Sequence, residues 1–149
     1  MSASLIQTVG YEGHTLASYL EVLQRAGVTL LCDVRRNPIS RKPGFAKRAL
    51  AAGCTSVGIR YEHLPALGIA SAARKGIRTA ADYAALFTTY ERDTLPRETA
   101  ALATIAAWVR AGERVALTCF ERDAHACHRS RVTAALAAQY GADLTATHL

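Results

Sequence analysis

The sequence lacks any apolar stretch that could cross a membrane. The longest such stretch, residues 100–109, has about ten residues, whereas a membrane-spanning helix needs about twenty. Residues 1–9 also lack the basic region followed by a long apolar region that marks a secretory signal peptide. These two absences predict a cytoplasmic protein with no membrane partner.

The spacing of the cysteines matches neither a secreted disulfide framework nor a structural zinc site. The four cysteines are Cys32, Cys54, Cys119 and Cys127. Structural zinc sites usually contain two close cysteine pairs, or one pair followed by two histidines. The Cys-x7-Cys-His spacing that ends at His128, with His125 nearby, keeps zinc as a minor alternative. We expect four free thiols and no metal, and the sequence identifies no cofactor.

Acidic residues are too few to balance the basic ones. Lys and Arg number 18 against 12 Asp and Glu, which gives a net charge of +6 and a pI near 9.5. This balance favours an anionic small molecule or nucleic acid as partner, although a generic basic surface is the competing interpretation. The 149 residues, half of them hydrophobic, fit one domain over residues 1–149 with its own core.

Hydrophobic periodicity predicts strands that alternate with helices. The expected strands are residues 5–9, 28–34, 59–64, 115–120 and 144–148. The expected helices are residues 16–23, 45–52 (ended by Gly53), 83–90, 102–109 and 127–140. Residues 28–34 are apolar on both faces, as a buried parallel strand requires. The pattern predicts one three-layer α/β domain, with a mostly parallel sheet of about five strands and helices on both faces.

Local signals place some of the helix ends and loops. Thr79 and Asp82 have the spacing of a capping box, and Pro96 stands where a first helical residue is expected. Residues 71–78 are basic and rich in small side chains, which predicts an exposed loop.

Reactive side chains follow the predicted strands. Tyr11, Asp33 and Glu121 each stand where an apolar run ends. The carboxyl ends of parallel strands meet at one edge of a sheet, where α/β proteins bind ligands, so we expect these residues to converge there. Asp33 and Arg35 point to the same face of a strand, so an ion pair between them is available. The structural interpretation is that Asp33 orients Arg35, and the functional one is that Asp33 is a base or Arg35 binds an anion; the two do not exclude each other.

The segment from Cys119 to Ser130 joins a strand to the last helix. A helix that begins near Cys127 presents unpaired backbone N–H groups and a positive dipole end, which suits phosphate or sulfate and lowers the pKa of the Cys127 thiol. We expect an anion site there, with Arg129 beside it and Arg35 completing it. The competing interpretation is structural: Cys119 is a small buried hydrophobe and Asp123 caps the helix.

Residues 35–48 form a basic segment that contains six Lys and Arg and two prolines. The segment could follow a nucleic-acid backbone or act as a solvated lid. Phe45 is the one aromatic residue within it, which gives little support for stacking on bases.

Three motifs in order resemble the bacterial and archaeal domain of unknown function numbered 488. They are Thr-Val-Gly-Tyr-Glu-Gly, then Asp-Val-Arg-Arg-Asn-Pro-Ile-Ser-Arg-Lys-Pro-Gly-Phe, and finally Cys-Phe-Glu with Cys-His-Arg. The resemblance runs from about residue 7 to the last helix and implies no established reaction. It implies these motif positions: Tyr11, Glu12, Asp33, Arg35, Asn37, Ser40, Pro43, Gly44, Phe45, Cys119, Glu121, Cys127, His128 and Arg129.

Three functions remain open at this point. The first is an enzyme, a hydrolase or transferase, that acts on a phosphorylated or nucleotide-like substrate. Its expected catalytic residues are Asp33, Cys119, Glu121 and His128, and its expected binding residues are Tyr11, Arg35, Asn37, Ser40, Arg41, Cys127 and Arg129. The second is a non-catalytic nucleic-acid-binding module that uses residues 35–48. The third is a structural or partner-binding domain whose charges pair with one another.

Overall fold

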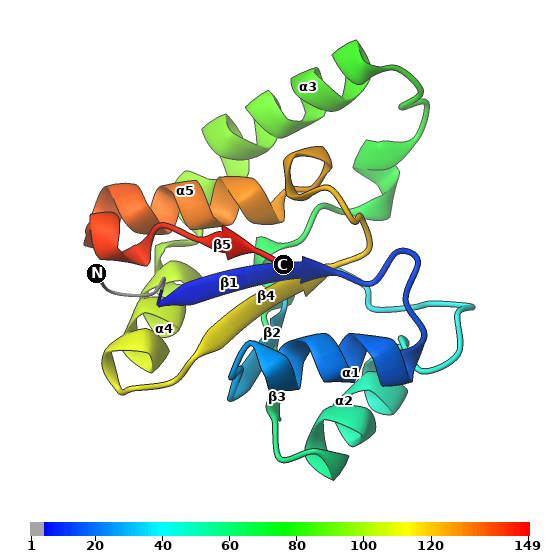
Figure 1. The fold of residues 1–149 in the computed structure, drawn as a ribbon. Coiled ribbons are helices and arrows are strands. Elements are labelled where there is room, and N and C mark those ends of the chain that lie inside the picture. The colour runs from blue at the N-terminus through cyan, green and yellow to red at the C-terminus, as the bar shows by residue number, and fades with distance from the viewer. Residues whose placement is uncertain (1–4) are drawn as a thin grey trace.

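The computed structural model describes residues 5–149, which form a five-stranded sheet covered by helices on both faces (Figure 1). The strands are β1 (Ile6–Gly10), β2 (Leu30–Asp33), β3 (Arg60–His63), β4 (Val115–Cys119) and β5 (Thr147–His148). Every pairing is parallel and the strand order is β3-β2-β4-β1-β5. The α/β fold predicted from the sequence is confirmed.

Five α-helices form the two outer layers. They are α1 (Leu16–Arg25), α2 (Lys47–Ser56), α3 (Ala80–Thr89), α4 (Thr99–Arg110) and α5 (Arg129–Tyr140). α1 and α2 cover one face, and α3, α4 and α5 lie on the other (Figure 1). Within residues 5–149, the helices are all too short or too polar to span a membrane.

The central strand β4 separates two hydrophobic cores. All five of its residues are buried. Leu117 packs with α4 and α5, whereas Ala116 packs with α1 and α2, because successive side chains of a strand point to opposite faces. The sequence of a strand that is buried on both faces is a continuous apolar run, and this run predicted β4.

Several predicted boundaries are wrong by a few residues. Gly53 does not end α2 but lies inside it, where a Cβ would fall 3.2 Å from the side chain of Leu16. The glycine therefore lets α1 approach α2 closely. Pro96 lies in a short 3-10 helix, Leu95–Arg97, and α4 begins at Thr99. Part of the expected loop 71–78 forms another 3-10 helix, Ser71–Arg74.

Other boundaries agree with the sequence. The capping box at Thr79 and Asp82 is present: each side chain accepts a hydrogen bond from the backbone N–H of the other residue. α5 begins at Arg129, two residues after the predicted start, and β5 is reduced to Thr147–His148 at the edge of the sheet.

Two glycines bring distant loops to the carboxyl edge of the sheet. A Cβ at Gly10 would fall 1.8 Å from the backbone oxygen of Glu121, and a Cβ at Gly68 would fall 2.1 Å from the backbone nitrogen of Arg36. Neither position has room for a larger residue. The loops that carry Glu121 and Arg36 are therefore fixed against the ends of other elements.

Candidate functional site

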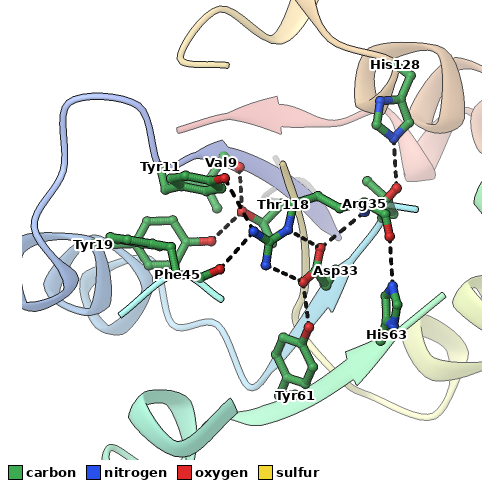
Figure 2. A network of polar contacts seen from close by, with 11 residues as sticks. Val9, Tyr11, Tyr19, Asp33, Arg35, Phe45, Tyr61, His63, Thr118 and His128 are labelled. Atoms are coloured by element: carbon green, nitrogen blue, oxygen red, sulfur yellow. Dashed lines mark hydrogen bonds and ion pairs between the residues drawn. The ribbon is translucent and has the colours of Figure 1, made fainter. Parts of the chain in front are cut away.

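Arg35 occupies the centre of the carboxyl edge, just beyond the end of β2 (Figure 2). Its Nε and Nη2 donate to the two carboxylate oxygens of Asp33, at 2.9 and 2.7 Å. Tyr61 also donates to Asp33, and the backbone N–H of Arg35 does the same. Asp33 is fully buried and its oxygens are occupied, so it orients Arg35 and is not placed to act as a base.

The remaining guanidinium nitrogen of Arg35 faces β1 and the basic segment. Nη1 donates to the hydroxyl of Tyr11 and to the backbone oxygen of Phe45, at 3.3 and 2.8 Å. Burial acts to lower the pKa of Arg35, but the hydrogen bonds and charge of Asp33 outweigh it and raise the pKa. Arg35 therefore stays charged, and its charge is balanced within the protein.

Arg129 holds the loop that follows β4. Its Nη1 donates to the sulfur of Cys119 and to the backbone oxygen of Glu121, at 2.9 and 2.6 Å, and its Nη2 donates to the backbone oxygen of Arg122. The residue is fully buried, and burial lowers its pKa. Both terminal nitrogens are used inside the protein, so Arg129 positions the loop in place of the anion-binding role expected from the sequence.

Cys119 and Cys127 form a disulfide across this loop. The expectation of four free thiols is therefore wrong for this pair, whereas Cys32 and Cys54 are free and buried as expected. Sequence reasoning missed the bond because the two residues meet only through the folded path of the loop between them. The sequence separation of 8 does not match any secreted framework.

His128 is buried beside this disulfide. Its Nε2 lies 2.8 Å from the backbone oxygen of Val34, and its Nδ1 lies 3.6 Å from the Cys127 sulfur. Burial lowers the pKa of His128 to about 4. The imidazole is therefore neutral at pH 7.

A polar pocket with a volume of about 150 Å³ lies at this edge of the sheet. Its lining residues come from the ends of β2 and β4, the Ser71–Arg74 helix and the start of α5: Arg35, Arg36, Asn37, Ile69, Ser71, Arg74, Cys119, Phe120, Glu121 and His128. Arg74 lies 3.8 Å from the Glu121 carboxylate, and the exposed Arg36 forms no ion pair in residues 5–149. The pocket thus combines Arg35, whose charge is balanced by the buried Asp33, with two further cations and one carboxylate.

A larger and more apolar cleft of about 530 Å³ lies next to this pocket, and Glu121 lines both. Its apolar wall is formed by one face of α3, with Tyr83 and Phe87. Polar groups of the loop after β4 also line the cleft, and the Arg131 guanidinium of α5 lies over the Phe87 ring, 5.3 Å from its centroid. The two cavities together offer a charged part and an aromatic part for one ligand.

The basic segment contributes less to the site than the sequence suggested. Asn37 lines the polar pocket, but Arg41 is exposed and Ser40 accepts a hydrogen bond from the backbone N–H of Lys42. Phe45 is fully buried and stacks on Tyr11, with ring centroids 4.6 Å apart. The aromatic residue of the segment therefore anchors it to the core and is not available to a base.

One group in residues 5–149 has the composition of a metal site. Ligand atoms of Cys119, Glu121 and Cys127 lie within 4.8 Å of one another. While the two sulfurs are bonded to each other, they do not act as ligands. The absence of a metal stays a prediction from the sequence.

The carboxyl edge brings together most of the residues that the sequence indicated. Cys119, Glu121 and His128 line the pocket, and Tyr11 and Asp33 lie behind Arg35. The sequence did not single out Arg36 and Arg74 as site residues. Both belong to segments noted as basic, but their positions depend on contacts such as the one at Gly68, which no local pattern encodes.

Comparison with known families identifies the family of this chain. The family model described as domain of unknown function DUF488 matches residues 15–136. The chain belongs to the DUF488 family. The match agrees with the resemblance carried by the three motifs, and it leaves the reaction of this DUF488 domain open.

Two crystal structures from Shewanella putrefaciens CN-32, each described as "Putative phosphatase (DUF442)", are similar to this chain at a low level. One is 15% identical with a TM-score of 0.43, and the alignment covers 94% of this chain and 64% of that chain. The other is 12% identical with a TM-score of 0.41, and the alignment covers 93% and 90%. Likeness at this level carries no argument about activity. The search of curated proteins found no match.

Proposed function

We propose that this DUF488 protein is an enzyme, a hydrolase or transferase, that acts on a small phosphorylated or nucleotide-like substrate in the polar pocket. One observation carries the proposal. Cys119 is a buried residue that lines a pocket together with arginines, and its sulfur lies 2.9 Å from the Arg129 guanidinium and 3.4 Å from the Glu121 carboxylate. A nucleophile beside a base and a fixed positive charge is the arrangement that covalent catalysis requires.

Arg36 and Arg74 are assigned to bind the anion. Arg36 is exposed at the pocket and forms no ion pair within residues 5–149, and the side chain of Arg74 is 34% exposed. Guanidinium groups form paired, charge-assisted hydrogen bonds with phosphate oxygens. Arg35 adds a positive charge to the wall of the pocket, and its hydrogen bonds to Asp33 fix its orientation.

The reduced form of Cys119 is assigned as the nucleophile. Glu121 accepts the thiol proton, and the sulfur attacks phosphorus while the bond from phosphorus to the leaving oxygen breaks. The proton held by Glu121 then passes to that oxygen, and water or an acceptor alcohol releases the phosphoryl group from sulfur. Because the disulfide to Cys127 blocks this sulfur, activity requires a reductant.

The apolar cleft is assigned to the organic part of the substrate. Tyr83 is 39% exposed and provides a ring surface, and Glu121 links the cleft to the pocket. A cleft of about 530 Å³ lies within the usual size range of ligand sites, about 300–1,000 Å³. This arrangement favours an aromatic phosphoester, with a mononucleotide as the leading example.

The test is a screen for phosphate release from mononucleotides and aryl phosphates by the protein in dithiothreitol. We expect Cys119→Ser to abolish release. Arg36→Ala or Arg74→Ala should raise KM about tenfold to a hundredfold, because one charge-assisted hydrogen bond contributes about 1.5–3 kcal/mol. Arg25→Ala is the matched control, since that side chain is 79% exposed on α1 and should leave KM unchanged. Release by Cys119→Ser at the native rate would refute the covalent step.

A nucleic-acid-binding module built on residues 35–48 is the weaker alternative. Arg36, Arg41, Lys47 and Arg48 are exposed and could contact phosphates, but Phe45 is buried and offers no stacking surface. Titration of a single-stranded oligonucleotide at several salt concentrations distinguishes the two proposals. Binding that weakens with salt and is lost in Arg41→Ala would favour the module.

A further inference from the structure

The disulfide joins two residues with different surroundings. Both are buried, but Cys119 ends β4 and lines the polar pocket, whereas Cys127 precedes α5 and does not line it. In the reduced state, the Arg129 guanidinium that lies 2.9 Å from Cys119 stabilises a thiolate there. Cys119 is therefore the sulfur suited to attack a substrate.

Cys127 has a proton acceptor in place of a positive charge. The Val34 carbonyl can only accept a hydrogen bond, so the Nε2 of His128, 2.8 Å away, carries the ring proton. The Nδ1 of the neutral ring then presents a lone pair, 3.6 Å from the Cys127 sulfur. Cys127 is thus held as a thiol whose proton His128 can receive.

We propose that Cys119 and Cys127 form a redox-active dithiol that reduces a hydroperoxide. The Cys119 thiolate attacks the terminal oxygen of the peroxide, the O–O bond breaks, and the departing oxygen takes a proton from water. The products are a sulfenic acid at Cys119 and an alcohol or water. The sulfur loses two electrons and the peroxide gains them.

Cys127 then resolves the sulfenic acid. Its proton passes to Nδ1 of His128 as its sulfur attacks the Cys119 sulfur, and the S–O bond breaks. The departing hydroxide takes the proton from His128 and leaves as water. The disulfide that results is the one in this structure, and a dithiol reductant returns it to two thiols while becoming a disulfide itself.

Access and proximity support both steps. Cys119 is 2% exposed and lines a pocket of about 150 Å³, which is larger than a hydrogen peroxide molecule. The two sulfurs are bonded to each other in this structure, so the fold accommodates the product of the second step. The proposal does not depend on phosphoryl transfer, because its measured quantities are thiols and peroxide.

The test uses the full chain, reduced with dithiothreitol, desalted, and treated with hydrogen peroxide. We expect the count of free thiols, measured after denaturation, to fall from four to two, and peptide mapping to join Cys119 to Cys127. Cys127→Ser should stop at a sulfenic acid on Cys119, which dimedone traps. Cys54→Ser is the control, since burial raises the pKa of that thiol to about 12, and it should form the disulfide at the native rate.

Peroxide consumption provides a second measurement that needs no variant. With excess dithiothreitol, the native protein should consume several equivalents of peroxide, at a rate at least about tenfold above a protein-free control. Oxidation of Cys32 or Cys54 as fast as Cys119 would overturn the proposal. A stable Cys119 sulfenic acid in the native protein, or consumption at the control rate, would do the same.

Discussion

Acidification provides a direct test of the environment assigned to His128. Burial lowers its pKa from 6.5 to about 4, so the folded protein holds it neutral at a pH where the unfolded chain protonates it. Unfolding therefore takes up a proton between these two pH values, and this contribution to stability is complete above pH 6.5 and is lost as the pH falls to about 4. The linkage relation gives a loss of about 2 kcal/mol between pH 7 and pH 5 and about 3 kcal/mol by pH 4.

Urea unfolding at pH 7, 6, 5 and 4, followed by circular dichroism, measures this loss. Other groups also titrate over this range, so the informative quantity is the difference between the native protein and His128→Gln. Glutamine keeps a donor for the Val34 carbonyl but does not titrate, and the variant should lose about 2 kcal/mol less than the native protein from pH 7 to pH 5. The exposed His125→Gln should keep the native slope. Parallel curves for the native protein and His128→Gln would refute the neutral, buried imidazole.

Three further substitutions test the packing that supports the site. Gly10→Ala should lower the thermal midpoint by several degrees and reduce anion affinity, because its Cβ would fall 1.8 Å from the Glu121 oxygen; an unchanged midpoint in calorimetry would contradict that contact. Leu117→Ala should reduce the free energy of urea unfolding by about 2–5 kcal/mol, and a loss below about 1 kcal/mol would mean that β4 is not buried on that face. Thr79→Ala should cost about 1 kcal/mol through the lost cap of α3, whereas Thr79→Ser should restore it.

The sequence predicted the sheet and its functional edge because both depend on local pattern. Residues 28–34 and 115–120 are apolar runs that only a doubly covered strand accommodates. The parallel topology then places Asp33 beside Thr118, one residue before Cys119. The meeting of these strand ends at one edge could be predicted without knowing any tertiary contact, and it is confirmed.

The sequence could not show how the site side chains are used. Arg129 and Arg74 are both basic residues near the expected site, yet the first is buried in the β4 loop and the second faces the pocket. Which arginine turns inward depends on carbonyl groups such as that of Glu121, which become available only when the loop has folded. Gly53 is a second example: its weak helix propensity predicted a helix end, but its packing against Leu16 places it inside α2.

The double use of Arg129 constrains how this domain can diversify. One guanidinium fixes the backbone after β4 and also lies against the Cys119 sulfur, ten residues earlier in the chain. An insertion or deletion between the two would move the sulfur away from its charge, so loop length there is tied to reactivity. The Ser71–Arg74 helix and α3 lie outside the loop between Cys119 and Arg129, so changes in their length do not alter this distance along the chain. We expect relatives that prefer different substrates to differ in these segments and to keep the loop from Cys119 to Arg129 at constant length.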